Sequence, residues 1–229
     1  MEFQGVIFDF NGVLWWDGPL HERAWQQLAV EIRGRSLSEE EIAAHVHGRT
    51  NRAILEYLSG RAMAKHEFEE LAQRKEALYR RLCLELGPEF RLSPGADDLL
   101  DFLAAHRVPR TIATSSDRIN LDFFIQHLRL ERWFEVALLV YDDGLRPGKP
   151  APDIYLQAAH NLGLEPLCCM VVEDSRAGVQ AAHTAGIGHI IALGPAHRHA
   201  QLAQLEGVDE VIENLEQFPA ERLSLRDPT

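Results

Sequence analysis

Five short apolar runs constrain the fold of this chain more than any other feature of its sequence. The first lies near the amino terminus, and the later ones alternate with segments of helical length. Such alternation is typical of a parallel sheet, because each crossover places a helix on one of its faces. We therefore predict an α/β fold with a doubly wound parallel sheet. The predicted strands are Val6–Phe8, Arg110–Ala113, Val136–Val140, Cys169–Val172 and His189–Ala192, and the predicted helices are Arg118–Leu128, Ile154–Leu162 and Arg176–Ala185.

Residues 20–90 have a different character. They contain no convincing strand and several amphipathic patterns of helical period, such as Ala24-Trp25-Leu28-Ile32. Ser38 followed by three glutamates predicts a helix start, since carboxylates are favourable at the positive end of a helix dipole. Ser93-Pro94-Gly95 is a turn signal. We predict two domains, a core of residues 1–15 and 94–229 and an inserted all-helical domain of residues 16–93.

Composition narrows the classes of protein to which this chain can belong. The net charge of −12 over 229 residues argues against a nucleic-acid binder, because such proteins need clustered lysines and arginines. No apolar stretch approaches the roughly 20 residues that span a bilayer, and the amino terminus lacks the pattern of a secretory signal. The three cysteines have neither the spacing of a metal site nor that of a disulfide framework. We expect a cytoplasmic monomer with no nucleic-acid or membrane partner.

Polar segments follow four of the predicted strands, where open α/β sheets place their ligands. Each segment alone is commonly a helix cap, a turn or a solvated loop. Their joint occurrence in this order indicates a site instead. The segments are Asp9-x-Asn11-Gly12, Thr114-Ser115-Ser116, Gly148-Lys149-Pro150 and Glu173-Asp174.

The chemistry of these four segments fits together. Asp9 and the Glu173-Asp174 pair offer the hard oxygen ligands that suit Mg²⁺. Lys149 adds a positive charge, while Thr114 and the backbone amides after it can hold phosphate oxygens. Phosphoryl transfer needs mainly positioning and charge stabilisation, which such a set provides. We expect Lys149 at a loop tip, so that Lys149→Ala leaves the fold intact.

The order of these segments resembles the four motifs of the haloacid dehalogenase superfamily, and the resemblance extends over nearly the whole chain. Within the superfamily, the chain is similar to the branch that contains β-phosphoglucomutase and related sugar-phosphate phosphatases. This resemblance implies a Rossmann-like core with a helical cap domain inserted after the first motif. The stretches that carry it are Leu20-His21-x-x-Ala24-Trp25, Gly48-Arg49-Thr50, Gly148-Lys-Pro-Ala-Pro-Asp-Ile-Tyr155 and Glu173-Asp-Ser-x-Ala-Gly178.

The resemblance also implies a role for each matching position of the core. Asp9 corresponds to the nucleophile that forms an aspartyl-phosphate, and its carboxylate also binds Mg²⁺. The backbone carbonyl of Asn11 is the second metal ligand, and Glu173 and Asp174 complete the metal site directly or through water. Thr114 and Lys149 are implied to bind the transferring phosphoryl group.

Further residues are implied to bind the substrate. In the core these are Ser115 and Ser116, which follow Thr114. In the cap, His21 matches a hinge histidine, Lys75 matches a lysine that faces the active site, and Arg49 lies where a substrate-recognition loop is expected. For Lys75 and Arg49, a solvated helix surface is an equally good interpretation.

The chain departs from the first motif at Asn11, where the superfamily has a second aspartate. That aspartate protonates the leaving oxygen and later deprotonates the attacking water, whereas an amide cannot exchange a proton at neutral pH. Losing general acid–base catalysis lowers the reaction rate by a factor of about 10²–10⁴. The loss is smallest for substrates with good leaving groups. The nucleophile and the metal ligands remain. Three explanations of Asn11 remain open. The residue can be natural, with His21 or the substrate supplying the proton, or it can be an inactivating substitution. In the third, the protein has lost catalysis and kept binding.

Together these observations predict a Mg²⁺-dependent phosphatase that acts on a small phosphorylated metabolite, for which a sugar phosphate is the first choice. Two alternatives remain open. One is a phosphomutase similar to β-phosphoglucomutase, and the other is a catalytically silent binding protein with the same fold.

Overall fold

The computed structural model describes residues 2–46 and 49–225. The chain divides into two compact units, because most contacts between residues lie within one unit or the other. We call Met1–Trp16 with Arg91–Thr229 the core unit and Asp17–Phe90 the cap unit, and each is described by itself. The sequence prediction placed these boundaries after residues 15 and 93.

Within the described residues, the core unit holds a parallel sheet of six strands in the order β3-β2-β1-β4-β5-β6. This order is that of a doubly wound sheet, in which the chain starts at the centre and winds toward each edge in turn. The α/β prediction is therefore confirmed. The strands are β1 (Gly5–Phe8), β2 (Arg110–Asp117), β3 (Val140–Asp142), β4 (Cys169–Glu173), β5 (His189–Leu193) and β6 (Glu210–Ile212).

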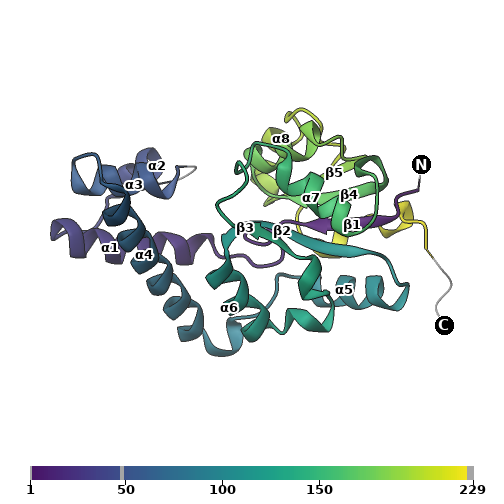
Figure 1. Ribbon diagram of the computed structural model, residues 1–229, viewed down its shortest axis with the longest axis horizontal. Coiled ribbons are helices and arrows are strands. Elements are labelled where there is room, and N and C mark those ends of the chain that lie inside the picture. Colours follow the sequence, from purple (N-terminus) through teal and green to yellow (C-terminus); the bar gives the residue numbers. More distant parts are fainter. Residues whose placement is uncertain (1, 47–48, 226–229) are drawn as a thin grey trace. The chain divides into compact units, whose positions relative to one another are not determined.

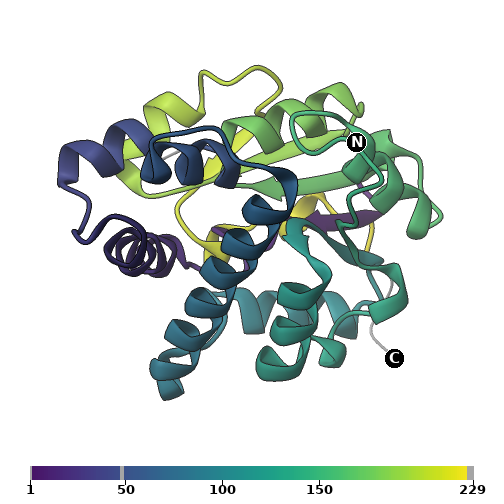
Figure 2. The same ribbon diagram turned by 60° about the vertical axis from the view of Figure 1, so that its left-hand side comes forward.

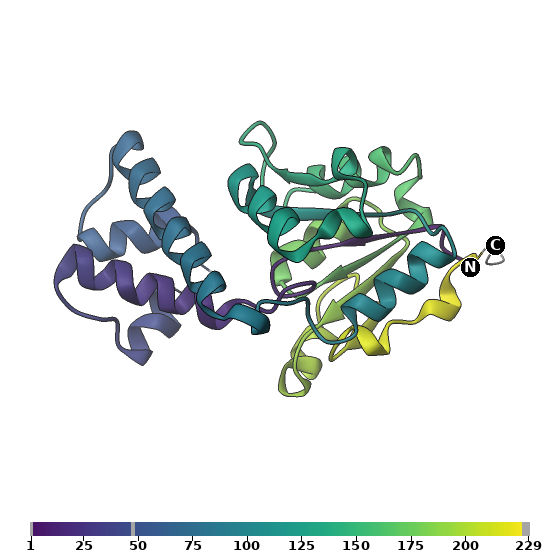
Figure 3. The same cartoon turned by 90° about the horizontal axis from the view of Figure 1, so that it is seen from below.

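Helices cover both faces of this sheet. In Figure 1, α5 (Ala96–Ala105) and α6 (Arg118–Leu128) lie on one face, while α7 (Asp153–Asn161) and α8 (Arg176–Thr184) lie on the other. The carboxyl-terminal segment, drawn in yellow in Figure 3, packs beside α5, and the Leu215 amide donates to the Pro94 carbonyl over 3.2 Å. The short helix α9 (His199–Leu202) follows β5.

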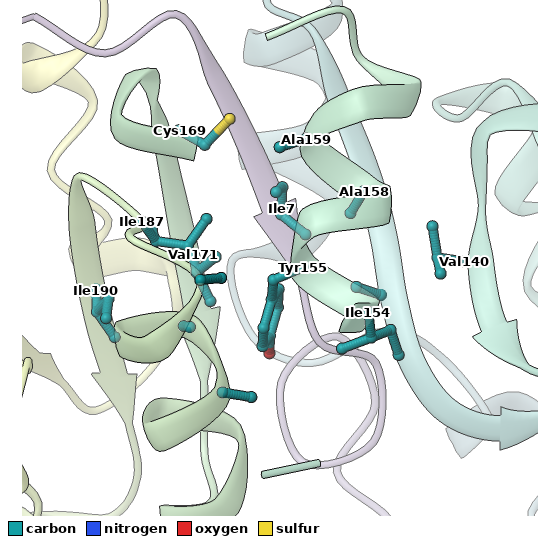
Figure 4. Packing of buried hydrophobic residues seen from close by; sticks show 14 of the residues in the cluster. Ile7, Val140, Ile154, Tyr155, Ala158, Ala159, Cys169, Val171, Ile187 and Ile190 are labelled. Atoms are coloured by element: carbon teal, nitrogen blue, oxygen red, sulfur yellow. The ribbon is translucent and has the colours of Figure 1, made fainter. Parts of the chain in front are cut away.

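The central strands are buried along their whole length because helices cover both of their faces. All residues of β1, β4 and β5 are buried, which explains why these strands read as uninterrupted apolar runs. The apolar cluster between the sheet and the α7–α8 face includes Ile7, Val171, Ile154 and Tyr155 (Figure 4). Burial of this kind is the main favourable contribution to folding.

The sheet differs from the sequence prediction at three strands. Val136–Leu138 forms a 3₁₀ turn rather than the start of a strand, and the Leu138 carbonyl accepts hydrogen bonds from side chains of Thr111 and Asn161 instead of joining a ladder. β2 continues to Asp117, so the predicted loop hydroxyls lie on the strand itself. The edge strand β6 was not predicted, because its three residues are too few to show a period.

The cap unit consists of four α-helices and one 3₁₀ turn within the described residues. The long helix α4 packs beside α1, which is seen end-on in Figure 2. The predicted helix start at Ser38 is confirmed, since its hydroxyl accepts from the Glu41 amide and the Glu41 carboxylate accepts from the Ser38 amide. The apolar core of the unit includes Trp25, Leu28 and Leu55. The helices are α1 (Gly18–Arg33), α2 (Glu39–His45), α3 (Asn51–Ser59) and α4 (Lys65–Glu85).

No helix in the described part of the chain is both long enough and apolar enough to cross a bilayer.

Candidate active site

The candidate site lies at the carboxyl ends of β1, β2 and β4, which are neighbours at the centre of the sheet. Asp9 follows β1 directly, and its backbone amide donates to the Val172 carbonyl of β4 over 3.0 Å. The chain then turns through Gly12, whose positive φ of 83° suits glycine, and the Gly12 amide donates to the Trp15 carbonyl over 2.7 Å. This turn fixes the Asp9 side chain beside the end of β4.

Lys149 connects Asp9, which follows β1, with Glu173, the last residue of β4. Its ammonium donates to Asp9 Oδ1 over 2.8 Å and to Glu173 Oε1 over 2.7 Å, and the carbonyl of Ala113 in β2 lies 3.3 Å away. The Lys149 side chain is only 7% exposed. Lys149 lies in the loop that follows β3, and its ammonium is buried because two buried carboxylates draw it inward.

The Glu173 carboxylate is held on both of its oxygens. Oε2 accepts from the Ser175 amide over 2.6 Å, at the start of α8, while Oε1 accepts from Lys149 and from the Tyr155 hydroxyl. Glycine at position 178 leaves room for this group, since a Cβ there would collide with Oε1. Glu173 is therefore fixed in place, with no exposed surface.

Asp174 brings a third carboxylate to the same place. One oxygen from each of Asp9, Glu173 and Asp174 lies within 4.8 Å of the other two. Gly12 makes this approach possible, because a Cβ at that position would collide with the Asp174 carboxylate. Three hard oxygen donors at this spacing fit a divalent cation such as Mg²⁺.

Burial, reinforced by neighbouring acids, raises the pKa values of Asp9 and Asp174. Burial raises the pKa of Asp9 to about 7, and Glu173 adds to the rise while Lys149 opposes it. Burial also raises the pKa of Asp174 well above its ordinary value, reinforced by Glu173 and Asp9. For Lys149, burial opposes the charged form, but attraction to Asp9 and Glu173 outweighs it and holds the pKa well above the ordinary value. The site therefore favours a bound cation.

Asn11 faces the hydroxyls of β2. Its Oδ1 accepts from Ser116 Oγ over 2.8 Å and lies 3.5 Å from Thr114 Oγ1, and the Thr114 hydroxyl accepts from the Ser116 amide over 3.1 Å. The structure thus brings two of the predicted hydroxyl residues to the amide of Asn11. Ser115 points elsewhere and lines a small hollow with Gly148 and Arg146.

The cap unit contains a second polar cluster, around His21. The His21 Nδ1 lies 2.6 Å from the Lys75 ammonium and its Nε2 lies 3.1 Å from Asp17 Oδ2, which also accepts from the Tyr79 hydroxyl over 2.6 Å. Since an ammonium can only donate, Nδ1 is the acceptor and Nε2 carries the proton. The His21 ring also stacks on Tyr79 at 4.1 Å.

Lys75 and Arg49 differ in their surroundings. Lys75 is 2% exposed, with its ammonium 5.3 Å from the Trp25 ring centroid and 2.8 Å from Glu76 Oε1, so the solvated interpretation is wrong for this residue. Arg49 is exposed, and its guanidinium donates to the Ala44 carbonyl over 3.3 Å. Gly48, which belongs to the same sequence stretch, lies outside the described residues.

The sequence alone indicates no role for two residues that lie beside Glu173 and Asp174. Tyr155 lies in a stretch that carried the resemblance, but its spacing does not reveal that its hydroxyl reaches Glu173. Arg198 follows β5, and its guanidinium lies 3.3 Å from the backbone carbonyl of Asp174. No sequence signal marks Arg198, because the loop that carries it has no motif.

Comparisons with known proteins identify the family of this chain. The chain is 33% identical over 187 residues to the phosphorylated carbohydrates phosphatase of Thermotoga maritima, which covers 82% of this chain and 83% of the relative. It is 32% identical over 192 residues to the β-phosphoglucomutase of Bacillus subtilis, with 80% of each chain covered.

A solved structure from Entamoeba histolytica, described as a HAD hydrolase of family IA, variant 3, superposes with a TM-score of 0.88. It is 37% identical and covers 97% of each chain. The sequence profile of the haloacid dehalogenase-like hydrolases matches residues 3–186. The chain belongs to the haloacid dehalogenase-like hydrolase family.

Proposed function

We propose that this protein is a Mg²⁺-dependent phosphatase that acts on a small phosphorylated metabolite through an aspartyl-phosphate on Asp9. The observation that carries the proposal is the Lys149 ammonium, which lies between Asp9 and Glu173 with the Asp174 carboxylate beside them. A carboxylate nucleophile next to a fixed ammonium and a trio of cation ligands matches what phosphoryl transfer requires.

In the first step, an oxygen of Asp9 attacks phosphorus, the bond to the leaving oxygen breaks, and the phosphoryl group remains on Asp9. Lys149 stabilises the negative charge on the transferring group, and the Thr114 hydroxyl contributes a hydrogen bond. Asp9, Asp174 and Glu173 would hold Mg²⁺, together with the backbone carbonyl of Asn11. When bound, this ion supplies charge neutralisation between the carboxylate and the phosphate. Water then cleaves the aspartyl-phosphate and releases phosphate.

Asn11 determines which substrates this site can process quickly. Its amide forms hydrogen bonds but does not transfer a proton, so the leaving oxygen departs as an anion or takes its proton from the substrate or from His21. In the described structure, His21 holds its proton on Nε2 toward Asp17 and accepts from Lys75 through Nδ1. This arrangement favours substrates whose leaving groups are stable anions.

Sugar phosphates are the first substrate class to test, because one relative is a phosphorylated carbohydrates phosphatase. A β-phosphoglucomutase is also among the relatives, so a phosphomutase is the alternative enzyme. Asn11 itself favours a further alternative, a binding protein that has lost turnover.

The test compares this chain with Asn11→Asp, using p-nitrophenyl phosphate, acetyl phosphate and a panel of sugar phosphates, with and without Mg²⁺. Asp9→Asn serves as the control without a nucleophile. We expect Mg²⁺-dependent phosphate release by both proteins and none by the control. Turnover by Asn11→Asp alone would identify the chain as an inactive form of the enzyme. If neither protein releases phosphate from any ester, the phosphatase proposal is wrong. Interconversion of hexose phosphates without net release would identify a mutase.

A further inference from the structure

Tyr155 places a phenol directly against the charged groups of the site. It lies in the first turn of α7, has no exposed surface and sits among apolar side chains of the core unit (Figure 4). Its hydroxyl donates to Glu173 Oε1 over 3.2 Å, and Lys149 donates to the same oxygen over 2.7 Å. The Lys149 ammonium also lies 5.0 Å from the centroid of the Tyr155 ring. Tyr155 thus contacts both members of the Lys149–Glu173 ion pair.

A hydroxyl at this position needs a reason other than packing. Phenylalanine would fill the same apolar space without burying a polar group, and burial of a hydroxyl is unfavourable unless it forms a hydrogen bond. The phenol has a single proton to donate, and it is directed at Glu173. A phenol is protonated at neutral pH, so the hydroxyl is a donor to Glu173 Oε1.

The three protons of the Lys149 ammonium are already matched by three acceptors. These are Asp9 Oδ1, Glu173 Oε1 and the Ala113 carbonyl, of which the last is the most distant at 3.3 Å. A phosphoryl oxygen must compete with these acceptors. The strength with which Glu173 attracts the ammonium therefore affects how strongly Lys149 can bind phosphate.

We propose that Tyr155 is a positioning residue that tunes Lys149 for phosphate through Glu173. By sharing Glu173 Oε1, its hydroxyl weakens the attraction of that oxygen for Lys149, while its ring face supports the ammonium through a cation–π contact. This inference rests on the proposed function of the same site, because it assumes that Lys149 binds the transferring phosphoryl group.

The test uses Tyr155→Phe, which removes only the hydroxyl, and Tyr155→Leu, which removes the ring as well. Trp133→Phe is the matched control, since Trp133 is a buried aromatic residue that loses one hydrogen bond, the one from its Nε1 to Asp101 over 2.6 Å. The measurements are kcat and KM for p-nitrophenyl phosphate, the competitive inhibition constant of inorganic phosphate, its affinity by calorimetry, and thermal unfolding.

We expect Tyr155→Phe to weaken phosphate binding about tenfold and to lower kcat/KM by a similar factor, the scale of one hydrogen bond to a charged group. Tyr155→Leu should weaken both further, whereas Trp133→Phe should change the melting temperature and neither constant. In a Glu173→Gln background, Tyr155→Phe should have at most a twofold effect, because the hydroxyl acts through the carboxylate.

Three outcomes would overturn the inference while the proposed function stands. One is wild-type phosphate affinity and turnover in Tyr155→Phe. Another is an equal loss in Trp133→Phe, and the third is an undiminished effect of Tyr155→Phe in the Glu173→Gln background. A wild-type chain that neither binds phosphate nor turns over any ester would remove the proposed function and this inference together.

Discussion

The Lys149 ammonium donates a hydrogen bond to the Asp9 carboxylate over 2.8 Å, although 140 residues separate the two in the sequence. The same ammonium reaches Glu173, so that one buried cation lies between two buried carboxylates. Removing this cation would leave both carboxylates buried without the charge that attracts them. The chemistry of the site and the stability of the core are therefore coupled through Lys149.

Lys149→Met should destabilise the protein as well as weaken phosphate binding. It leaves Asp9 and Glu173 buried without their cation, which costs about 3–5 kcal/mol at pH 8. At pH 5.5 the loss should be smaller, because Asp9, with a pKa of about 7, is then protonated. Urea denaturation at both pH values measures this. Lys65→Met, on an 86% exposed side chain, should change the free energy of unfolding by about 0.5 kcal/mol or less. An equal loss for Lys149→Met at both pH values would contradict the explanation.

Much of this site could be predicted because strand order alone brings its parts together. Asp9, Lys149 and Glu173 each follow or flank an apolar run, and parallel strands end at one edge of the sheet. Central strands are buried on both faces, so their sequences are almost purely apolar and easy to find. The helix over Arg118–Leu128 also has the predicted bounds, since Asp117 caps its start.

The remaining features depend on packing that no local pattern encodes. The burial of Lys75 follows from its contacts with His21 and Trp25, which lie on another helix of the cap unit. No local pattern shows that the hydroxyl of Tyr155 reaches Glu173 or that the guanidinium of Arg198 reaches the backbone carbonyl of Asp174. Val136–Leu138 has the composition of a strand, yet hydrogen bonds from side chains to the Leu138 carbonyl compete with the ladder.

Mg²⁺ affinity should rise with pH because a proton competes for Asp9. With the pKa of Asp9 near 7, the apparent affinity should increase about tenfold between pH 6 and pH 8, and more if Asp174 also loses a proton. The folded, metal-free protein holds the Asp9 proton more tightly than the unfolded chain does. Its stability should therefore fall as the pH rises from about 4 through about 7. Calorimetry and thermal unfolding test both trends, and Asp9→Asn should reduce them. A pH-independent affinity would show that Asp9 is already ionised at pH 6.

Asn11→Asp should raise kcat selectively for substrates with poor leaving groups. A carboxyl group can protonate the leaving oxygen. This raises the rate by a factor of about 10²–10⁴ for a sugar phosphate and by much less for acetyl phosphate. The measurement is kcat/KM for aryl and alkyl phosphates plotted against the pKa of the leaving alcohol. The slope should be steep for the present chain and shallow for Asn11→Asp. Parallel slopes would mean that another group already supplies the proton.

Arg198→Ala should strengthen Mg²⁺ binding without changing a metal ligand. The Arg198 guanidinium lies 3.3 Å from the Asp174 carbonyl, and its positive charge opposes the rise in the pKa of Asp174 that burial and the neighbouring acids cause. The same charge repels a divalent ion more strongly than a proton, because the Coulomb energy scales with the charge of the ion. We therefore expect a gain in affinity on the order of threefold at pH 8, and a smaller gain at pH 6.5, where the proton on Asp174 competes more strongly with the ion.

Isothermal titration with Mg²⁺ at the two pH values measures the change. Arg132→Ala is the control, because it removes an arginine that pairs with Asp101 on the surface. Arg198→Lys keeps the charge and should bind Mg²⁺ as the present chain does. If the lysine variant binds Mg²⁺ as the alanine variant does, the hydrogen bond to the Asp174 carbonyl matters more than the charge. A loss of affinity in Arg198→Ala would contradict the electrostatic explanation.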